Sequence, residues 1–222
     1  MATVDIRGDI ISNDNKWIYD WLGWESTCPN DIAQILQTKD ANEEVTVLIN
    51  SGGGSVLAGQ EIYSLLYGRD DVKIKIMSMA GSAAGVIAMA NHCSISPVAM
   101  LMIHNVSMSG ASGDYHDMQK NVEILKQMNA ALANAFSTKT GKSIDEVLKI
   151  MDKETWLTAR QALEMGFVDE ITKDNVQYIN DAFGLRLTDE IKAKVMKEKE
   201  QKDALEKMKA SIIGDLDKYG SR

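Results

Sequence analysis

Short apolar runs and longer segments of helical spacing alternate along most of the chain. The run VTVLIN at 45–50 is rich in β-branched residues and ends in polar and glycine residues, which predicts a buried strand. The next segment, 55–68, carries its apolar residues at helical spacing. Strands are predicted at 1–12, 45–50, 72–77, 99–105 and 167–171, and helices from Pro29 and at 55–68, 82–90, 114–136, 143–151 and 158–166. Strands that alternate with helices in this way predict an α/β fold with crossover connections.

Three tryptophans near the N-terminus, Trp17, Trp21 and Trp24, have the spacing of one helix face. A ligand platform would use such a stripe, but core packing or a subunit contact is the more frequent use of apolar residues at this spacing. We therefore expect a packing or contact surface here.

The character of the chain changes near residue 176. Residues 188–210 are rich in lysine and glutamate, and KEKEQKD at 197–203 interrupts the apolar positions on either side. A continuous coiled coil needs an unbroken apolar seam, so none is expected. We predict a domain at 1–175 and a charged, mainly helical C-terminal extension at 176–222 that is largely solvated.

Composition and charge narrow the class of protein. The 222 residues are 45% hydrophobic and 25% charged, which is ordinary for a globular protein. A net charge of −8 provides no basic field for nucleic acid or anionic lipid. Cys28 and Cys93 form no CxxC pair, so neither a zinc site nor a disulfide framework is expected. The N-terminal MATVDIRGDI does not resemble a signal peptide and no apolar run is long enough to span a bilayer, so we expect a cytoplasmic protein without membrane contact.

The segment INSGGGSV at 49–56 lies where a predicted strand ends and a helix begins. Glycines there permit positive φ and close approach of the backbone to a ligand, and free N–H groups at a helix start favour an anion. The segment lacks the Lys and Ser/Thr of a P-loop and the spacing of a dinucleotide fingerprint. An oxyanion hole is the second interpretation, and it requires a nucleophile nearby.

A second strand-to-helix junction contains two serines, Ser78 and Ser82. A serine hydroxyl is a poor nucleophile without a base to take its proton. His92 lies in a polar loop and His116 at the start of the long helix, whereas His104 ends the apolar strand AMLMI. These residues indicate nucleophilic chemistry, and the pattern by itself leaves both serines open.

Four segments of the chain together resemble the ClpP-type caseinolytic peptidases. They are INSGGGSVLAG, SMAGSAAGVIAMA, MLMIHN and TWLTARQALEMGFVDEI, in the order and approximate spacing of that family. The similarity covers roughly residues 3–172 and is greatest to the ClpP-related prohead, or head maturation, proteases of phages and prophages. It implies a ClpP/crotonase-like fold of repeated strand–helix units, with a protruding long helix and a helical C-terminal tail.

The resemblance also implies roles for individual residues. The family's nucleophile pattern G-x-A-x-S falls on 78–82, which implies Ser82 as the nucleophile and Ser78 in place of the leading glycine. The His of MIH implies His104 as the base. A register shifted by three residues would put Gly85 at the nucleophile position. We reject it because a nucleophile belongs at the helix mouth, where free N–H groups hold developing negative charge.

The third triad member and the oxyanion donors are implied in the same way. The family's acid precedes an aromatic-Leu-Ser/Thr step by two residues, which implies Glu154, with Asp152 as the alternative acid. The backbone N–H groups of Gly53 and Ala83 are implied as the oxyanion hole. This chemistry requires no metal and no organic cofactor.

The implied activity is that of a serine endopeptidase, which hydrolyses protein or peptide substrates through an acyl-enzyme in homo-oligomeric rings. Processing of phage prohead or scaffold proteins is its narrower form. The sequence contains no feature that identifies an ATPase unfoldase partner. Three alternatives stay open: a crotonase-like acyl-CoA enzyme, a Ser–Lys peptidase, and a catalytically idle structural or assembly component.

Overall fold

The chain has two compact parts in the computed structural model, which describes residues 2–173 and 188–219, with side chains through 210. The two parts are Met1–Gly184 and Leu185–Arg222. The predicted boundary between residues 175 and 176 lies outside the described residues. Each part is described below by itself.

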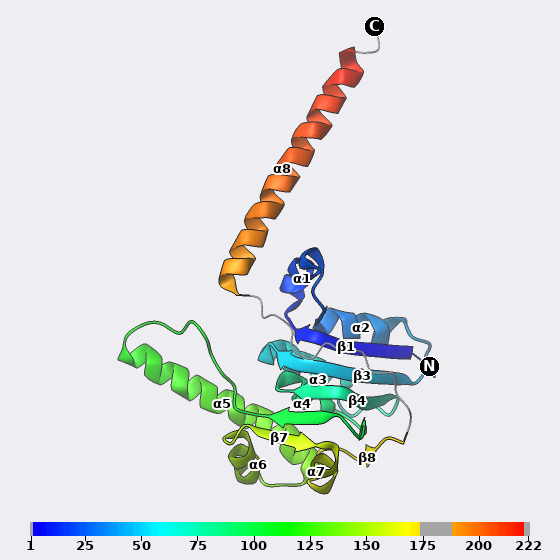
Figure 1. Ribbon diagram of the computed structural model, residues 1–222, viewed down its shortest axis with the longest axis vertical. Helices are drawn as coiled ribbons and strands as arrows, with labels where there is room; N and C mark the ends of the chain where they lie inside the picture. The colour runs from blue at the N-terminus through cyan, green and yellow to red at the C-terminus, as the bar shows by residue number, and fades with distance from the viewer. Residues whose placement is uncertain (1, 174–187, 220–222) are drawn as a thin grey trace. The chain divides into compact units, whose positions relative to one another are not determined.

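A mostly parallel sheet forms the centre of the first part (Figure 1). Its described strands are β1 Ala2–Ile10, β2 Ser26–Thr27, β3 Val45–Gly54, β4 Val72–Gly81, β5 Cys93–Ile95, β6 Met100–Ile103, β7 Thr155–Thr158 and β8 Glu170–Ile171. The order is β2-β1-β3-β4-β5-β8, and β6 pairs with both β4 and β7. All described pairings are parallel except that of β6 with β7. The predicted α/β fold is therefore confirmed.

Helices occupy the connections between the strands. They are the short 3-10 helix η1 Asn13–Asn15 and the α-helices α1 Lys16–Leu22, α2 Pro29–Thr38, α3 Val56–Leu66, α4 Ala83–Ala88, α5 Tyr115–Thr140, α6 Ile144–Met151 and α7 Ala159–Glu164. Ser143 and Glu146 form the predicted capping box of α6, in which each side chain accepts from the other residue's backbone N–H. The N-terminal half of α5 projects away from the sheet (Figure 1), in agreement with the protruding long helix that the family resemblance implies.

The inward faces of β3 and β4 make the centre of the core. Val45, Val47 and Ile49 of β3 are fully buried at every second position, and Ile74 and Ile76 of β4 are buried beside them. Each such side chain contributes about 1.5–3 kcal/mol through burial. Because β3 and β4 are parallel, their carboxyl ends lie at the same edge, where the glycine segment and the serine junction follow.

An irregularity in β4 determines where the serine junction lies. Ile49 pairs with Ile76, but two residues later Ser51 pairs with Ala80, so β4 contains two extra residues that bulge out of the ladder. Ser78 lies within this bulge. Before the bulge β4 pairs with β5, and after it β4 pairs with β6. After the bulge, the end of β4 therefore pairs with β6, the strand that His104 directly follows.

Three short strands are missing from the sequence prediction: β2, which pairs with the end of β1, and the strands β5 and β7. The prediction has a loop at 91–98, where β5 forms, and begins a helix at Thr158, where β7 ends. β5 and β7 are short and pair with residues far away in the chain, so a local pattern of apolar residues does not mark them. α4 is also shorter than the predicted 82–90 and ends at Ala88.

The prediction that Trp17, Trp21 and Trp24 share one helix face is wrong for Trp24. Trp17 and Trp21 lie in α1, but Gly23 ends that helix in a left-handed conformation, so Trp24 follows outside it. Trp24 packs edge-on against Tyr19, with ring centroids 5.8 Å apart. None of the three indoles is fully buried, and Trp21 is 40% exposed. A contact between subunits at this surface stays a prediction.

The second part contains a long described helix, α8 Asp189–Tyr219. The helix continues without a break through 197–203, although that segment interrupts its apolar positions. Leu205 and Met208 are 51% and 62% exposed, as expected of a solvated helix. In the described ranges, no helix combines the length and apolar character needed to cross a membrane.

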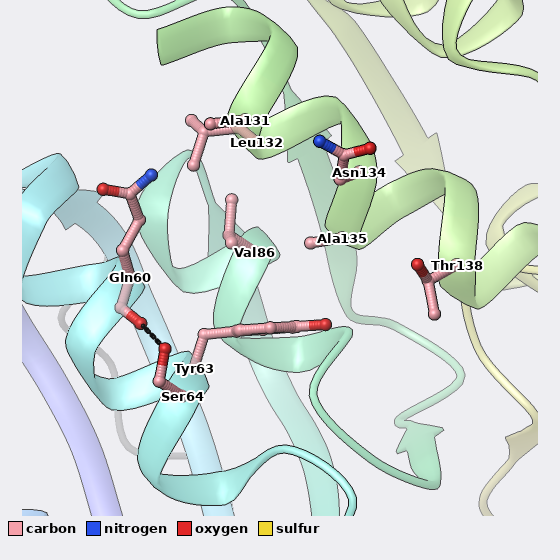
Figure 2. A pocket seen from close by; sticks show the side chains of 9 residues that line it. All are labelled: Gln60, Tyr63, Ser64, Val86, Ala131, Leu132, Asn134, Ala135 and Thr138. Atoms are coloured by element: carbon pink, nitrogen blue, oxygen red, sulfur yellow. Dashed lines mark hydrogen bonds between the residues drawn. The ribbon is translucent and has the colours of Figure 1, made fainter.

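An open hollow of about 370 Å³ lies between α3, α4 and α5 (Figure 2). Its walls are Gln60, Tyr63 and Ser64 of α3, Val86 of α4, and the face of α5 from 131 to 138. Burial in this wall raises the pKa of the Tyr63 hydroxyl. The hollow is lined by none of the predicted catalytic residues and belongs to the helical layer.

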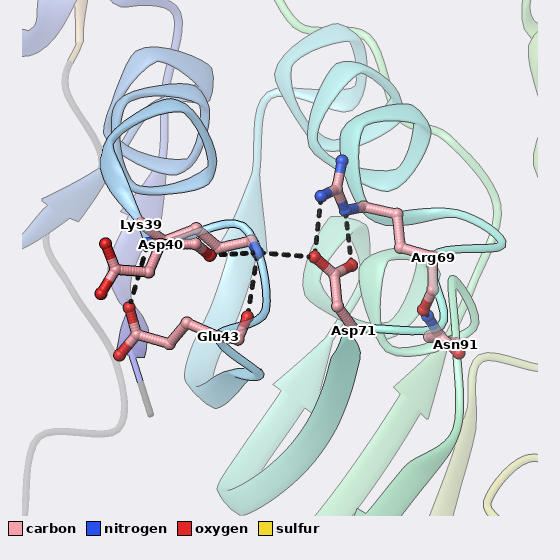
Figure 3. A network of polar contacts seen from close by, with 6 residues as sticks. All are labelled: Lys39, Asp40, Glu43, Arg69, Asp71 and Asn91. Carbon is pink, nitrogen blue, oxygen red and sulfur yellow. Dashed lines mark hydrogen bonds and ion pairs between the residues drawn. The ribbon is translucent and has the colours of Figure 1, made fainter.

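A buried cation joins the loops that precede β3 and β4 (Figure 3). Lys39, whose side chain is only 5% exposed, lies 2.9 Å from the Asp71 carboxylate and donates to the carbonyl oxygens of Asp40 and Glu43 at 3.2 and 2.9 Å. Arg69 donates two further hydrogen bonds to the same carboxylate, at 3.0 and 2.9 Å. The Arg69 and Lys39 hydrogen bonds hold the pKa of Asp71 well below its usual range.

We expect Asp71→Asn to lower the free energy of unfolding at pH 7 by about 1–3 kcal/mol, because it leaves the buried Lys39 ammonium without its counter-charge. The pKa of Asp71 is lower in the folded state, so its contribution is present above the ordinary aspartate pKa near 4 and is lost as the pH falls toward the folded value. Chemical denaturation should show the difference from wild type shrinking between about pH 5 and pH 3.

The neighbouring exposed carboxylate gives the control for this prediction. Asp70→Asn should leave the stability and its pH dependence unchanged, because Asp70 is exposed. The same pH dependence in wild type and Asp71→Asn would contradict the prediction.

Candidate active site

Ser82 occupies a sharp turn between the end of β4 and the start of α4. Its φ of 51° and ψ of −120° lie in a region that residues with a side chain rarely adopt. Its N–H donates to the carbonyl oxygen of Met102 at 3.0 Å, and its own carbonyl oxygen accepts from Val86 N–H at 3.1 Å. The turn is therefore held from the β6 side and the helix side, and it presents the hydroxyl at the mouth of the helix.

His104 directly follows β6 and reaches this hydroxyl. Its Nε2 lies 2.7 Å from Ser82 Oγ, which is hydrogen-bonding distance. Met102 lies two residues before His104. The hydrogen bond from Ser82 N–H to the Met102 carbonyl oxygen therefore holds the segments that carry the Ser82 and His104 side chains next to each other. A serine and an imidazole at this distance can transfer a proton between them.

The antiparallel pairing of β6 with β7 sets the position of the candidate acids. The last paired residues are Ile103 and Thr155, so continuation of the register by one residue places Glu154 opposite His104. Glu154 has a φ of 47°, and Ser82 and Glu154 are the two non-glycine residues with positive φ in the part of the chain that the structure describes. Such strain costs about 1–3 kcal/mol per residue and concentrates at functional sites.

Each candidate acid is held by a nearby N–H group. Glu154 Oε1 accepts from the indole Nε1 of Trp156 at 3.4 Å, and Asp152 Oδ1 accepts from the side-chain amide of Asn105 at 2.8 Å. The register favours Glu154 over Asp152 as the partner of His104. The assignment of the third triad member stays a prediction.

Gly53 passes against the serine turn. A Cβ on Gly53 would lie 2.7 Å from both Ser82 Cβ and the Gly81 carbonyl oxygen and 3.0 Å from Ala83 N, so only glycine fits at its φ of 104°. Ala83 is the first residue of α4, and the first N–H groups of a helix have no acceptor within the helix. Both predicted oxyanion residues therefore lie beside the hydroxyl.

The amide of Gly53 is engaged within the chain. Its N–H donates to Ser51 Oγ at 3.1 Å, and that buried hydroxyl donates to the Gly8 carbonyl oxygen at 2.6 Å. The next residue but one, Ser55, donates its N–H to Ile10 of β1 at 2.7 Å. Because the N–H groups of Gly53 and Ser55 are both engaged within the chain, the intervening Gly54 N–H is a further candidate donor. The sequence analysis did not name Gly54 as a donor.

The rejected register at Gly85 has no room for an accessible hydroxyl. Gly85 is buried in α4, and a Cβ there would lie 3.2 Å from the Met102 carbonyl oxygen and 3.3 Å from Leu101 Cδ1. His92 lies at the other end of β4, where its carbonyl oxygen accepts from Ile74 N–H at 2.9 Å. His116 is exposed in the first turn of α5.

The buried Cys93 thiol is unsuited to nucleophilic chemistry. Burial raises the pKa of the Cys93 thiol to about 12, so it stays protonated at neutral pH and is not a nucleophile. In the described residues, no cluster of three or more His, Cys, Asp and Glu side chains is arranged to hold a metal ion.

Comparison with known proteins gives the family. Residues 26–175 match the family model described as Clp protease. The chain is 31% identical over 160 residues to the ATP-dependent Clp protease proteolytic subunit 2 of Tropheryma whipplei, covering 68% of this chain and 88% of that one. It is also 31% identical over 180 residues to subunit 1 of the same kind of protease from Leifsonia xyli, covering 77% and 91%.

A solved structure shares the fold. A mutant of ClpP1 from Listeria monocytogenes superposes with a TM-score of 0.62 over 78% of this chain and 91% of that one, at 23% sequence identity. The family match covers more than half of the chain, and two relatives exceed 30% identity over more than two thirds of it. The chain therefore belongs to the Clp protease family and is a serine-type endopeptidase of the ClpP type.

Proposed function

We propose that Ser82, His104 and Glu154 form the catalytic triad of this endopeptidase. The observation that carries the proposal is the 2.7 Å distance between Ser82 Oγ and His104 Nε2, on a serine whose backbone is strained at a helix mouth. Glu154 is supported as the third member because it directly precedes Thr155, the last residue of β7 that pairs with β6, just as His104 directly follows Ile103.

The reaction follows from these positions. Ser82 Oγ attacks the scissile carbonyl carbon while His104 Nε2 accepts its proton, and the same proton then goes to the leaving amine as the C–N bond breaks. Water, deprotonated by His104, attacks the resulting ester and releases the new carboxyl end and the free serine. Glu154 orients the imidazole and stabilises its protonated form.

In the proposal, two backbone donors stabilise the charge that develops on the carbonyl oxygen. We assign one to Ala83 N–H and the second to the Gly53–Gly54 segment, with Gly54 N–H as the candidate because Gly53 N–H donates to Ser51. Each preorganised donor of this kind is worth about 100- to 1,000-fold in rate.

The substrates of the proposal are extended protein or peptide chains, which a glycine-lined strand end admits closely. Processing of phage prohead or scaffold proteins stays a prediction from the motif resemblance. The names of the relatives describe ATP-dependent proteases, so an ATPase partner is the competing prediction for how substrate arrives. An acyl-CoA enzyme, a Ser–Lys peptidase or an idle component fits less well, because each leaves the Ser82–His104 pair without a role.

Assembly into rings is part of the proposal. α5 exposes Val122 and Ile124 along its projecting half, and the hollow between α3 and α5 adds a partly apolar recess (Figure 2). Exposed apolar surface of this kind is typical of contacts between subunits. A cytoplasmic location agrees with Cys28 and Cys93, which are both free and buried.

Ser82→Ala should abolish covalent labelling by a fluorophosphonate probe, because the probe reacts with an activated serine hydroxyl. Ser78→Ala should be labelled like wild type, since Ser78 lies in the β4 bulge and not beside His104. Intact-protein mass spectrometry gives the measurement. Labelling that survives Ser82→Ala would refute the assignment.

Gly53→Ala should reduce the labelling rate by about 100-fold or more, because the new Cβ collides with Ser82 and displaces the turn beside Ala83. Gly23→Ala is the matched control: Gly23 also has positive φ, at 66°, but a Cβ there meets nothing within 4 Å. It should cost about 1 kcal/mol of stability and leave labelling unchanged. Equal labelling of the two variants would count against the close contact.

Static light scattering should find a mass several times the 24.5 kDa of one chain at micromolar concentration, if rings form. Adding a charge to the projecting helix, as in Val122→Glu, should shift the mass downward because Val122 would enter an apolar contact. A monomeric wild type would contradict the ring.

A further inference from the structure

Trp156 is an exposed aromatic residue whose indole N–H is directed at the candidate acid. It lies in β7, is 41% exposed, and donates from Nε1 to Glu154 Oε1 at 3.4 Å. An indole that packs in a core is mostly buried, so packing alone does not account for this position.

The sheet register places Trp156 near the end of the ladder that leads to the candidate triad. Met102 pairs with Trp156, and the ladder ends one pair later at Ile103 and Thr155, so His104 and Glu154 lie directly beyond its end. The alternate residues Ile103 and Leu157 point the other way and are buried. Trp156 therefore contacts the candidate acid at the end of the ladder that leads to His104.

The acid at this position is a glutamate, which has one more rotatable bond than an aspartate. Its backbone is fixed by the φ of 47° and by donation of Glu154 N–H to the Met151 carbonyl oxygen at 3.1 Å. The side chain is exposed, so its own packing does not select one rotamer. A carboxylate has two oxygens, and a donor that holds one of them directs the other.

We propose that Trp156 is a positioning residue of the active site: its indole N–H holds Oε1 of Glu154 so that Oε2 faces His104. The proposal rests on the triad proposed above and adds a fourth member that acts through the acid. It explains how a longer carboxylate can serve in a site that an aspartate would fill with less freedom.

The test uses the rate of Ser82 labelling by a fluorophosphonate, measured from about pH 5 to pH 9, because this rate requires neutral His104 and no knowledge of the substrate. Trp156→Phe keeps the aromatic ring and removes the N–H. We expect the plateau rate to fall about 5- to 10-fold, the loss of an ordinary hydrogen bond, because the Trp156–Glu154 contact is long and exposed. We also expect the midpoint of the acid limb to move to lower pH, since a less well placed Glu154 stabilises the imidazolium less.

Trp21→Phe is the matched control, because Trp21 is equally exposed, at 40%, and lies in α1. Its rate and midpoint should equal those of wild type. Thermal unfolding of each variant shows whether the folded fraction has changed, since loss of folded protein lowers the rate without moving the midpoint.

A double-mutant cycle with Glu154→Gln decides whether Trp156 acts through the acid. In the Glu154→Gln background, Trp156→Phe should change the labelling rate by less than about 2-fold, because the charged acceptor is already gone. The inference is overturned if the two effects multiply, if the midpoint stays fixed, or if Trp156→Phe matches wild type. Labelling that persists in Ser82→Ala would instead refute the proposed triad itself.

Discussion

The hydrogen bond from Ser82 N–H to the Met102 carbonyl oxygen is the interaction on which the site depends. It joins the turn that carries the proposed nucleophile to the strand that leads to the proposed base. The β4–β6 ladder ends at Gly81 and Met102, so this bond is the backbone contact that continues it into the turn, where the Ser82 backbone has a φ of 51°. The bulge in β4 makes the bond possible, because it moves the strand from β5 to β6 just before the serine.

The pairing of β6 with β7 is the second constraint. It is the antiparallel exception in an otherwise parallel described sheet, and it brings a segment some fifty residues later in the chain to the end of β6. The parallel strands supply the edge with the glycine segment and the serine, and the antiparallel pair brings the candidate acids to it. Strands are stiffer supports than loops, so the proposed base and acid both lie next to the end of a ladder.

Much of this arrangement follows from local sequence. Runs such as VTVLIN predict buried strands because β-branched residues fit a pleated sheet, and the helix mouth at Ser82 follows from the small residues after it. β5 and β7 could not be predicted locally, because their partners lie far along the chain. The same limit applies to Gly53, whose place beside Ser82 is indicated by its glycine neighbours, but whose amide partner Ser51 depends on the path of the folded strand. The Trp156–Glu154 contact also needs the β7 backbone to be known.

The positive φ values of Ser82 and Glu154 have a thermodynamic consequence. Together they cost about 2–6 kcal/mol, a large share of the roughly 5–15 kcal/mol by which a domain is stable. Glycine would relieve that cost at either position while removing a side chain of the proposed triad. If the proposed triad is correct, selection for stability alone would favour inactive descendants, and activity persists only while the hydrophobic core supplies enough stability to support both strained turns.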